Sequence, residues 1–198
     1  DAVVRRFAQP IVLPRYLPQN AVAFLGTLAM QGNVARMQTG PILLPPDAGN
    51  DWHDAFVRRL LTAFTQATGR DLAAEIGADP AMLGRSVYFG NFALLSHRGD
   101  DDATLNYGNA LALNLWECGW GEFTAMSSRD TAPHAGRAAR EAMMVEVTAN
   151  GFVSDYSGER VSRSGRRFLI VDATVWRLRD AAGAPFGVAA FVPRVDYL

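Results

Sequence analysis

Three polar residues in the last third of the chain could form a binding or proton-transfer site. Tyr156 and Arg160 are four residues apart on a predicted strand, so both side chains point to one face. Asp172 interrupts an apolar row on the next predicted strand, and a buried carboxylate needs a partner. A three-residue turn with Gly165 in the left-handed conformation would bring Asp172 to that same face, whereas a two-residue turn would not. We favour the three-residue turn; the cluster then lines a pocket or forms a structural ion pair.

Four further residues could contact a ligand, and each has a structural alternative. Arg129 lies in a polar loop, where its forked guanidinium suits a carboxylate or phosphate, but it could equally cap a helix or pair with Asp130. Asn106 could bind a ligand or make local hydrogen bonds in a turn. Trp116 and Trp176 could stack on a planar ligand, although buried tryptophans more often belong to the core.

The residue patterns that other kinds of site require are absent from the sequence. Cys118 is the only cysteine, so the chain forms no internal disulfide and no cysteine-based zinc site. His53, His97 and His134 are far apart and lack metal-binding spacing. There is no Lys for a Schiff base, no nucleophile elbow and no phosphate-binding loop. No metal is predicted, and the catalytic residues of any reaction stay unknown.

The elements that position these residues begin after a proline-rich stretch. Residues 1–50 are predicted to be an N-terminal extension, with a loose hairpin around Gln31-Gly32-Asn33. A helix is predicted from its N-cap Asp51 to its stop at Gly69, because apolar residues recur there at three- and four-residue steps.

The remainder of the chain alternates between β and α patterns before ending in a β-meander. Helices are predicted over Ala110–Cys118 and Arg137–Thr148, with Asn109 as the N-cap of the first. Strands are predicted over four segments: Ser86–Ser96, Phe152–Ser162, Arg166–Leu178 and Phe186–Pro193. Short turns between the last three strands imply antiparallel neighbours, so the class is α+β. Both faces of Phe168–Leu178 are apolar, which predicts that the extension or a partner covers the outer face.

Composition excludes some classes of partner. The formal net charge is −1 and all 19 basic residues are Arg, which lacks the positive excess that nucleic acid binding requires. Apolar residues make up 49% of the sequence, a value typical of a globular domain with a full core. The run Ala21–Met30 is too short to cross a membrane, and one cysteine fits a reducing cytoplasm. We therefore expect a cytoplasmic protein without nucleic acid or membrane partners.

Seven short motifs in order carry a resemblance to a known family. Together they resemble the MEKHLA domain, a PAS-related family that includes small bacterial proteins, over residues 51–198. The motifs are Asn106-Tyr107-Gly108-Asn109, Leu115-Trp116-Glu117, Ser128-Arg129, Gly151-Phe152, Tyr156-Ser157-Gly158-Glu159-Arg160, Gly165-Arg166-Arg167-Phe168 and Ala173-Thr174-Val175-Trp176.

The resemblance implies a PAS-like α+β fold, with an antiparallel sheet of about five strands and helices on one face. It also implies a role in sensing rather than a named reaction. Flavin-binding light sensors of the PAS class use an Asn-Cys-Arg-Phe context that Glu117-Cys118-Gly119 does not match. His134 could ligate haem as in some PAS sensors, but a capping or surface histidine is favoured. No cofactor is therefore predicted.

Three functions remain open on these grounds. The preferred function is a ligand-binding module that takes up a small organic molecule and regulates self-association, as a homodimer, or a partner. The second is a small-molecule enzyme that uses Tyr156 or Asp172 for proton transfer and Arg129 or Arg160 to hold an anion. The third is a structural domain that dimerises through the outer face of the last strands.

Overall fold

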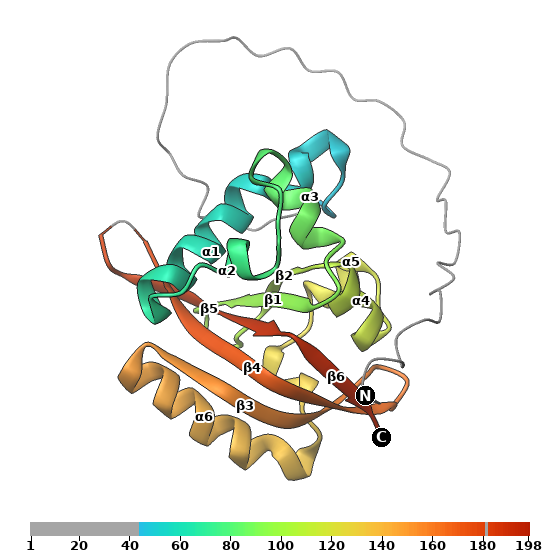
Figure 1. The fold of residues 1–198 in the computed structure, drawn as a ribbon. Helices are drawn as coiled ribbons and strands as arrows, with labels where there is room; N and C mark the ends of the chain where they lie inside the picture. The colour runs from blue at the N-terminus through green and yellow to red at the C-terminus, as the bar shows by residue number, and fades with distance from the viewer. Residues whose placement is uncertain (1–43, 181) are drawn as a thin grey trace, which may run out of the picture. The chain divides into compact units, whose positions relative to one another are not determined.

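The structure, a computed structural model, describes residues 44–180 and 182–198. The hairpin predicted around Gln31 lies outside the described residues. The described residues form a six-stranded sheet in which β2, β1, β5, β4 and β3 are neighbours in that order and every pair is antiparallel (Figure 1). β6 pairs with β4 beyond the end of β5. The strands are β1 (Ala93–Arg98), β2 (Leu105–Gly108), β3 (Phe152–Val161), β4 (Arg167–Arg179), β5 (Pro185–Val192) and β6 (Arg194–Tyr197).

Helices lie on both faces of this sheet. α6 packs against β3 and β4 on one face, whereas α1 packs against β4 from the other (Figure 1). The remaining helices are short and connect the strands. The helical elements are η1 (Ala48–His53), α1 (Asp54–Thr68), α2 (Leu72–Glu75), η2 (Pro80–Met82), α3 (Leu83–Tyr88), α4 (Ala110–Trp116), α5 (Trp120–Phe123), η3 (Ser128–Thr131), η4 (His134–Gly136) and α6 (Arg137–Asn150).

The predicted α+β class is confirmed, and so is the predicted meander, which is formed by β3, β4 and β5. α6 ends at Gly151, whose φ of 88° is left-handed, and α4 begins after Asn109, whose Oδ1 accepts a hydrogen bond from the Ala112 N–H at 3.1 Å. The start of α4 and the end of α6 are therefore as predicted, whereas α4 ends at Trp116, two residues before the predicted Cys118, because Glu117 adopts the left-handed conformation.

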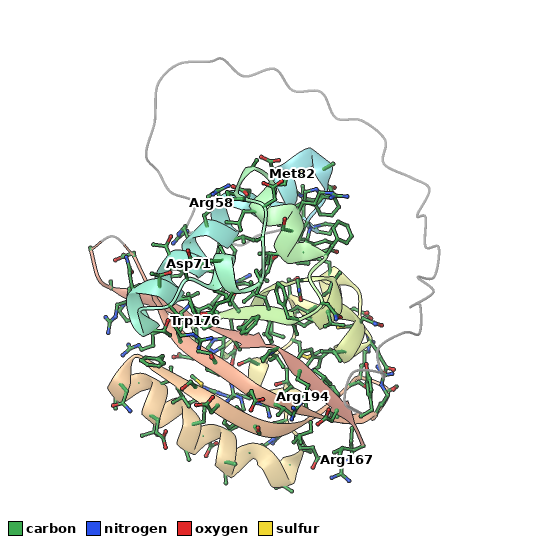
Figure 2. The ribbon with its side chains drawn as sticks, viewed as in Figure 1. Arg58, Asp71, Met82, Arg167, Trp176 and Arg194 are labelled. Carbon is green, nitrogen blue, oxygen red and sulfur yellow. The ribbon has the colours of Figure 1, made fainter. Side chains whose placement is uncertain are left out.

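α1 covers the outer face of β4, which the sequence assigned to the extension or a partner. Trp176 is fully buried on the side of the sheet that faces α1 (Figure 2). Its indole Nε1–H donates to the Leu60 carbonyl oxygen at 3.2 Å, and its ring meets Phe64 edge-on with centroids 5.1 Å apart. Because buried aromatic and aliphatic side chains contribute about 1.5–3 kcal/mol each, this contact anchors α1 on the sheet.

One extra residue in β4 changes which side chains face each layer. Gly158 pairs with Ile170 and Tyr156 pairs with Ala173, so residues 156 to 158 of β3 oppose residues 170 to 173 of β4. The bulged residue is Asp172, whose φ of 57° is left-handed.

The bulge makes the strict alternation predicted for this strand wrong. Ile170 and Val175 both face the α6 side, although they are an odd number of residues apart. Trp176 and Leu178 belong instead to the core beneath α1. A strand with a regular pleat would have placed Ile170 and Trp176 on the same face.

Two predicted boundaries are wrong in the region before β1. The helix expected from Asp51 begins at Asp54, because Asp51, Trp52 and His53 all have left-handed φ angles, of 56°, 53° and 56°. Asp51 is not an N-cap: Asp47 caps η1, and α1 begins after His53 without a side-chain cap.

The segment Ser86–Ser96, predicted as one strand, contains the end of α3 and only the first part of β1. Leu83 and Val87 are four residues apart and pack together with α1 in one apolar core, which favours a helix there. Gly84 lets α3 approach the start of α1 closely, since a Cβ at this position would lie 2.8 Å from the Asp54 Cα.

Candidate ligand-binding pocket

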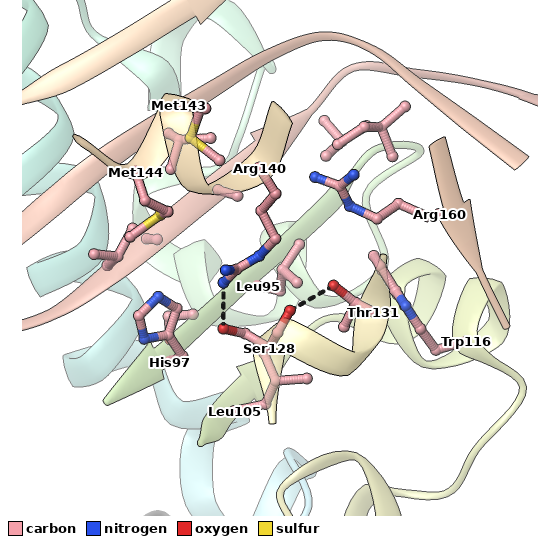
Figure 3. Close-up of a pocket in the computed structure, with 17 residues that line it drawn as sticks. Leu95, His97, Leu105, Trp116, Ser128, Thr131, Arg140, Met143, Met144 and Arg160 are labelled. Carbon is pink, nitrogen blue, oxygen red and sulfur yellow. Dashed lines mark hydrogen bonds between the residues drawn. The ribbon is translucent and has the colours of Figure 1, made fainter. Parts of the chain in front are cut away.

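A pocket lies between α6, η3 and the face of the sheet opposite α1 (Figure 3). Its cavity volume is about 60 Å³. The floor is apolar because β1, β4 and β5 each direct aliphatic side chains to this face. These side chains include Leu95, Ile170, Val175, Val188 and Ala190.

α6 forms one wall of the pocket and carries its most adaptable side chains. Met143 and Met144 line the cavity, and Arg140 lies one turn earlier on the same helix. Methionine side chains are unbranched and polarizable, so they can repack around molecules of different shape. The size of the cavity therefore depends on the conformation of two flexible side chains.

Arg140 extends from α6 into the pocket and is held by η3. Only 9% of its surface is exposed, and its Nη2 donates to Ser128 Oγ at 2.8 Å (Figure 3). Thr131 Oγ1 donates to the Ser128 carbonyl oxygen at 2.7 Å and so fixes the loop that presents Ser128. Burial, followed by the positive charges of Arg160 and Arg129, lowers the pKa of Arg140.

Arg160 enters the same pocket from β3 (Figure 3). Its Nη1 donates to the Glu159 carbonyl oxygen at 2.7 Å, and its Nη2 lies 3.5 Å from the Tyr156 hydroxyl. The guanidinium carbon is 5.5 Å from the centroid of the Tyr156 ring, within the range of a cation–π contact. Among the described residues, no carboxylate forms an ion pair with Arg160 or with Arg140.

Two residues that line the pocket hold buried polar atoms without a hydrogen-bond partner in the described chain. These atoms are Nε2 of His97 and Nε1 of Trp116. Nδ1 of His97 lies 2.6 Å from the Arg98 carbonyl oxygen, so Nδ1 carries the proton and a neutral ring keeps Nε2 as an acceptor. Burial lowers the pKa of His97, which favours that neutral ring. Trp116 can only donate.

The structure brings some of the predicted residues to the pocket. Trp116 and Arg160 line the cavity. Tyr156 lies directly behind Arg160, and Asn106 supports the wall because its Oδ1 accepts from Ser96 Oγ at 2.7 Å. Asn106 and Tyr156 are thus one contact away from the space that a ligand would occupy.

The other three predicted residues lie elsewhere. Arg129 is exposed on η3, and Trp176 is buried on the opposite side of the sheet. Asp172 is exposed at the bulge and forms no ion pair in the described part of the chain, so the predicted cluster with Tyr156 and Arg160 is wrong. Tyr156, Asp172 and an arginine therefore do not converge on one point, an arrangement that would have favoured the enzyme hypothesis.

The turn on which that prediction depended is nevertheless correct. Three residues separate Ser162 and Arg166, which are joined by a backbone hydrogen bond of 2.8 Å, and Gly165 has a φ of 88°. The bulge at Asp172 then pairs Tyr156 with Ala173 in place of Asp172, and a second irregularity in β3 restores the original register at Val153 and Val175.

Sequence reasoning missed Arg140, Ser128 and His97. A signal for Arg140 was present, because it is three and seven residues before Met143 and Val147 and therefore shares the buried face of α6. No comparable pattern marks Ser128 or His97, which reach the pocket through loop and strand geometry.

Comparison with known families identifies the chain. The model of the MEKHLA domain matches residues 54–197. The chain belongs to the MEKHLA domain family. A comparison of this MEKHLA domain with curated proteins found no match.

Solved structures similar to this MEKHLA domain include an RNA-binding light-oxygen-voltage receptor, with 18% identity, a TM-score of 0.49 and coverage of 57% of this chain. The chain spans 32% of that receptor. A PAS domain from a two-component sensor histidine kinase has 16% identity and a TM-score of 0.45, covering 58% of this chain and 91% of its own. A PAS domain from Colwellia psychrerythraea has 7% identity and a TM-score of 0.49, covering 54% and 88%.

Within residues 44–180 and 182–198, no helix combines the length and the apolar character that a membrane span needs. Nor do they contain a group of three or more His, Cys, Asp or Glu side chains arranged to hold a metal ion.

Proposed function

We propose that this MEKHLA domain is a sensory module that takes up a small organic molecule in the pocket between α6 and the sheet. The observation that carries the proposal is the pair of buried, unpartnered atoms in the wall, Nε2 of His97 and Nε1 of Trp116. Buried polar groups are nearly always hydrogen-bonded, so each such group requires an explanation. A ligand that accepts from Trp116 and donates to His97 supplies one.

The size of the cavity supports a ligand smaller than the usual organic cofactors. Pockets for drug-sized ligands have volumes of roughly 300–1,000 Å³, whereas this cavity measures about 60 Å³. Cys118, the thiol that a flavin adduct would need, is not among the residues that line it. We therefore propose a ligand of a few non-hydrogen atoms, smaller than a flavin or a haem.

We further propose that α6 transmits occupancy. It carries Arg140, Met143 and Met144 into the pocket, while Val145 on its other side is 68% exposed. If α6 can pack against the sheet in two ways, a ligand that favours one packing would raise the population of that packing. The surface that α6 presents to solvent would then change. That surface would then regulate homodimerisation or a protein partner in the cytoplasm. The outer face of β4 is not free for this role, because α1 covers it.

Native mass spectrometry of the freshly purified full chain tests ligand uptake. We expect an additional bound mass that is lost in Ala190→Phe, which fills the pocket, and kept in Ala184→Phe, which alters an exposed residue just before β5. A wild-type protein without bound mass, and without thermal stabilisation by any compound of a small-molecule library, would contradict the proposal.

Light scattering tests the regulatory half of the proposal. The molar mass is measured before and after the bound species is removed by unfolding and refolding. A change in molar mass supports ligand-dependent self-association, and the same mass in both states contradicts it.

A further inference from the structure

Two buried arginines in the pocket have no counter-ion. The described residues contain seven ion pairs, and the arginines that form them have side chains between 40% and 62% exposed. Arg140 and Arg160 are only 9% and 6% exposed, yet neither belongs to any of those pairs. Arginine is rarely buried without a partner, because removing its charge from water is unfavourable unless an opposite charge compensates.

The protein partners of these two guanidinium groups are few and neutral. A guanidinium has five N–H donors. Arg140 donates to the Ser128 hydroxyl, and Arg160 donates to the Glu159 carbonyl oxygen and the Tyr156 hydroxyl. Both side chains line the cavity, so N–H groups without a protein acceptor are available to a molecule inside it.

The two positive charges also act on each other. After burial, the charge of Arg160 is the largest influence that lowers the pKa of Arg140, and the exposed Arg129 adds to it. Like charges repel more strongly at a partly buried site than in water. An anion between them would remove this repulsion and complete the hydrogen bonding of both guanidinium groups.

We propose that the pocket is a receptor for a short-chain organic acid whose carboxylate binds between Arg140 and Arg160. The inference rests on the proposed function and specifies the ligand class. A forked guanidinium binds a carboxylate through two parallel hydrogen bonds, and Ser128 is placed beside the first of the two arginines. The aliphatic part of the acid would contact the apolar floor, which includes Val175 and Val188.

His97 adds a preference within this class. Its Nε2 is an acceptor in the neutral ring, so it suits a hydroxyl or N–H on the ligand and repels a further oxyanion. A hydroxy acid therefore fits the wall better than inorganic phosphate, whose oxygens are all polar and which has no apolar part.

Calorimetric titration of the full wild-type chain provides the first test and needs no variant. The probes are propionate, its neutral isostere propionamide, lactate and inorganic phosphate. We expect propionate to bind at least about 10-fold more tightly than propionamide, because hydrogen bonds to charged groups are the stronger ones. Lactate should bind at least as tightly as propionate, and phosphate more weakly than either.

Variants provide the second test. Arg140→Gln and Arg160→Gln should each weaken propionate binding about 10- to 100-fold, which is the effect expected from the loss of a charge-assisted contact. Arg137→Gln is the matched control, because Arg137 lies on the same helix, is exposed and pairs with Asp130. It should leave the affinity unchanged.

The failure of this inference and the failure of the proposed function give different results. Propionamide that binds as tightly as propionate, or a co-purified neutral molecule that Arg140→Gln retains, would overturn the carboxylate inference and leave the pocket's function intact. A wild-type chain that binds none of the four probes and carries no co-purified molecule would overturn both.

Discussion

Arg140 is placed on the buried face of α6, beside apolar residues, where a charge is unfavourable for the free protein. Such placements are retained in proteins when the charge serves a ligand, and they lower the stability of the unoccupied state. If Arg140 served only to hold η3 through its hydrogen bond to Ser128, replacing it would lower the stability of the fold. Stability measurements therefore distinguish a receptor role from a structural one.

Arg140→Met should raise the free energy of unfolding of the ligand-free protein by about 1–2 kcal/mol. Replacing a buried charge by an apolar side chain of similar length removes the desolvation penalty, although Ser128 loses a donor. Urea denaturation measures the change, with Arg137→Met as the exposed control, which should stay within about 0.5 kcal/mol of the wild type. A loss of stability in Arg140→Met would point to a structural role.

His97 makes stability depend on pH below the pKa of an unfolded histidine, about 6.5. Burial lowers its pKa in the folded state below that of the unfolded chain, so protons bind more tightly to the unfolded state. Stability is therefore complete above the unfolded pKa of about 6.5 and falls as the pH decreases through the folded pKa, by at most about 1.4 kcal/mol per pH unit.

The expected result is a smaller decrease between pH 7 and 5 in His97→Gln than in the wild type, measured by urea denaturation at each pH. His134→Gln is the control, because His134 is exposed. The carboxylates whose pKa values are lowered, Asp100, Glu117 and Glu159, affect stability only at more acidic pH. Equal slopes in His97→Gln and the wild type would show that another group titrates.

At the scale of single elements, the bulge at Asp172 determines which side chains of β4 line the pocket. Asp adopts the left-handed conformation more readily than most residues, but a β-branched residue there is strained. Asp172→Val should therefore destabilise the protein by about 1–2 kcal/mol, while Asp172→Gly should be neutral or stabilising.

Thermal denaturation of both variants tests this role of the bulge. Asp196→Val is the control, because Asp196 is exposed on β6 and its φ is not positive. A stable Asp172→Val protein would indicate that β4 can lose the bulge without penalty.

The elements differ in how far the sequence determines them. α6 and the strands β3, β4 and β5 could be predicted, because capping residues and short turns such as the one at Gly165 act locally. The helix Leu83–Tyr88 could not, because a short apolar run fits a helix or a strand and its contacts with α1 decide the outcome. The bulge could not be predicted either, because no local sequence pattern at Asp172 distinguishes a bulged residue from a paired one.

The pocket was predicted only in part for the same reason. Trp116 and Arg160 lie on elements whose orientation the sequence indicates, and both line the cavity. Arg129 and Asp172 were assigned from their chemistry alone, and the structure places both on the surface. Long-range register and loop geometry decide such positions, and neither can be read from neighbouring residues.

At the scale of the whole described region, the sheet separates two apolar layers. Phe64 and Trp176 belong to the core beneath α1, whereas Met143 and Val175 belong to the contact between α6 and the sheet. Substitutions in the first layer should therefore affect stability without changing the residues that contact a ligand.

Phe64→Ala should lower the free energy of unfolding by about 3–5 kcal/mol, because it opens a cavity at a fully buried position. The affinity for propionate, measured below the unfolding transition, should change less than about 3-fold, since sites without shared contacts behave nearly additively. Met143→Ala, by contrast, alters a residue that lines the pocket and should change the affinity for propionate directly. A large loss of affinity in Phe64→Ala would show that the two layers are coupled.

Val175 and Trp176 are adjacent along the backbone, yet their side chains enter opposite layers. A displacement of this part of β4 by a bound molecule would move the indole on the far side by a similar amount, without any atom passing through the sheet. Trp176 fluorescence would then report ligand binding in a pocket that the indole does not contact. The domain would thus contain a natural optical probe, separated from the ligand by one thickness of backbone.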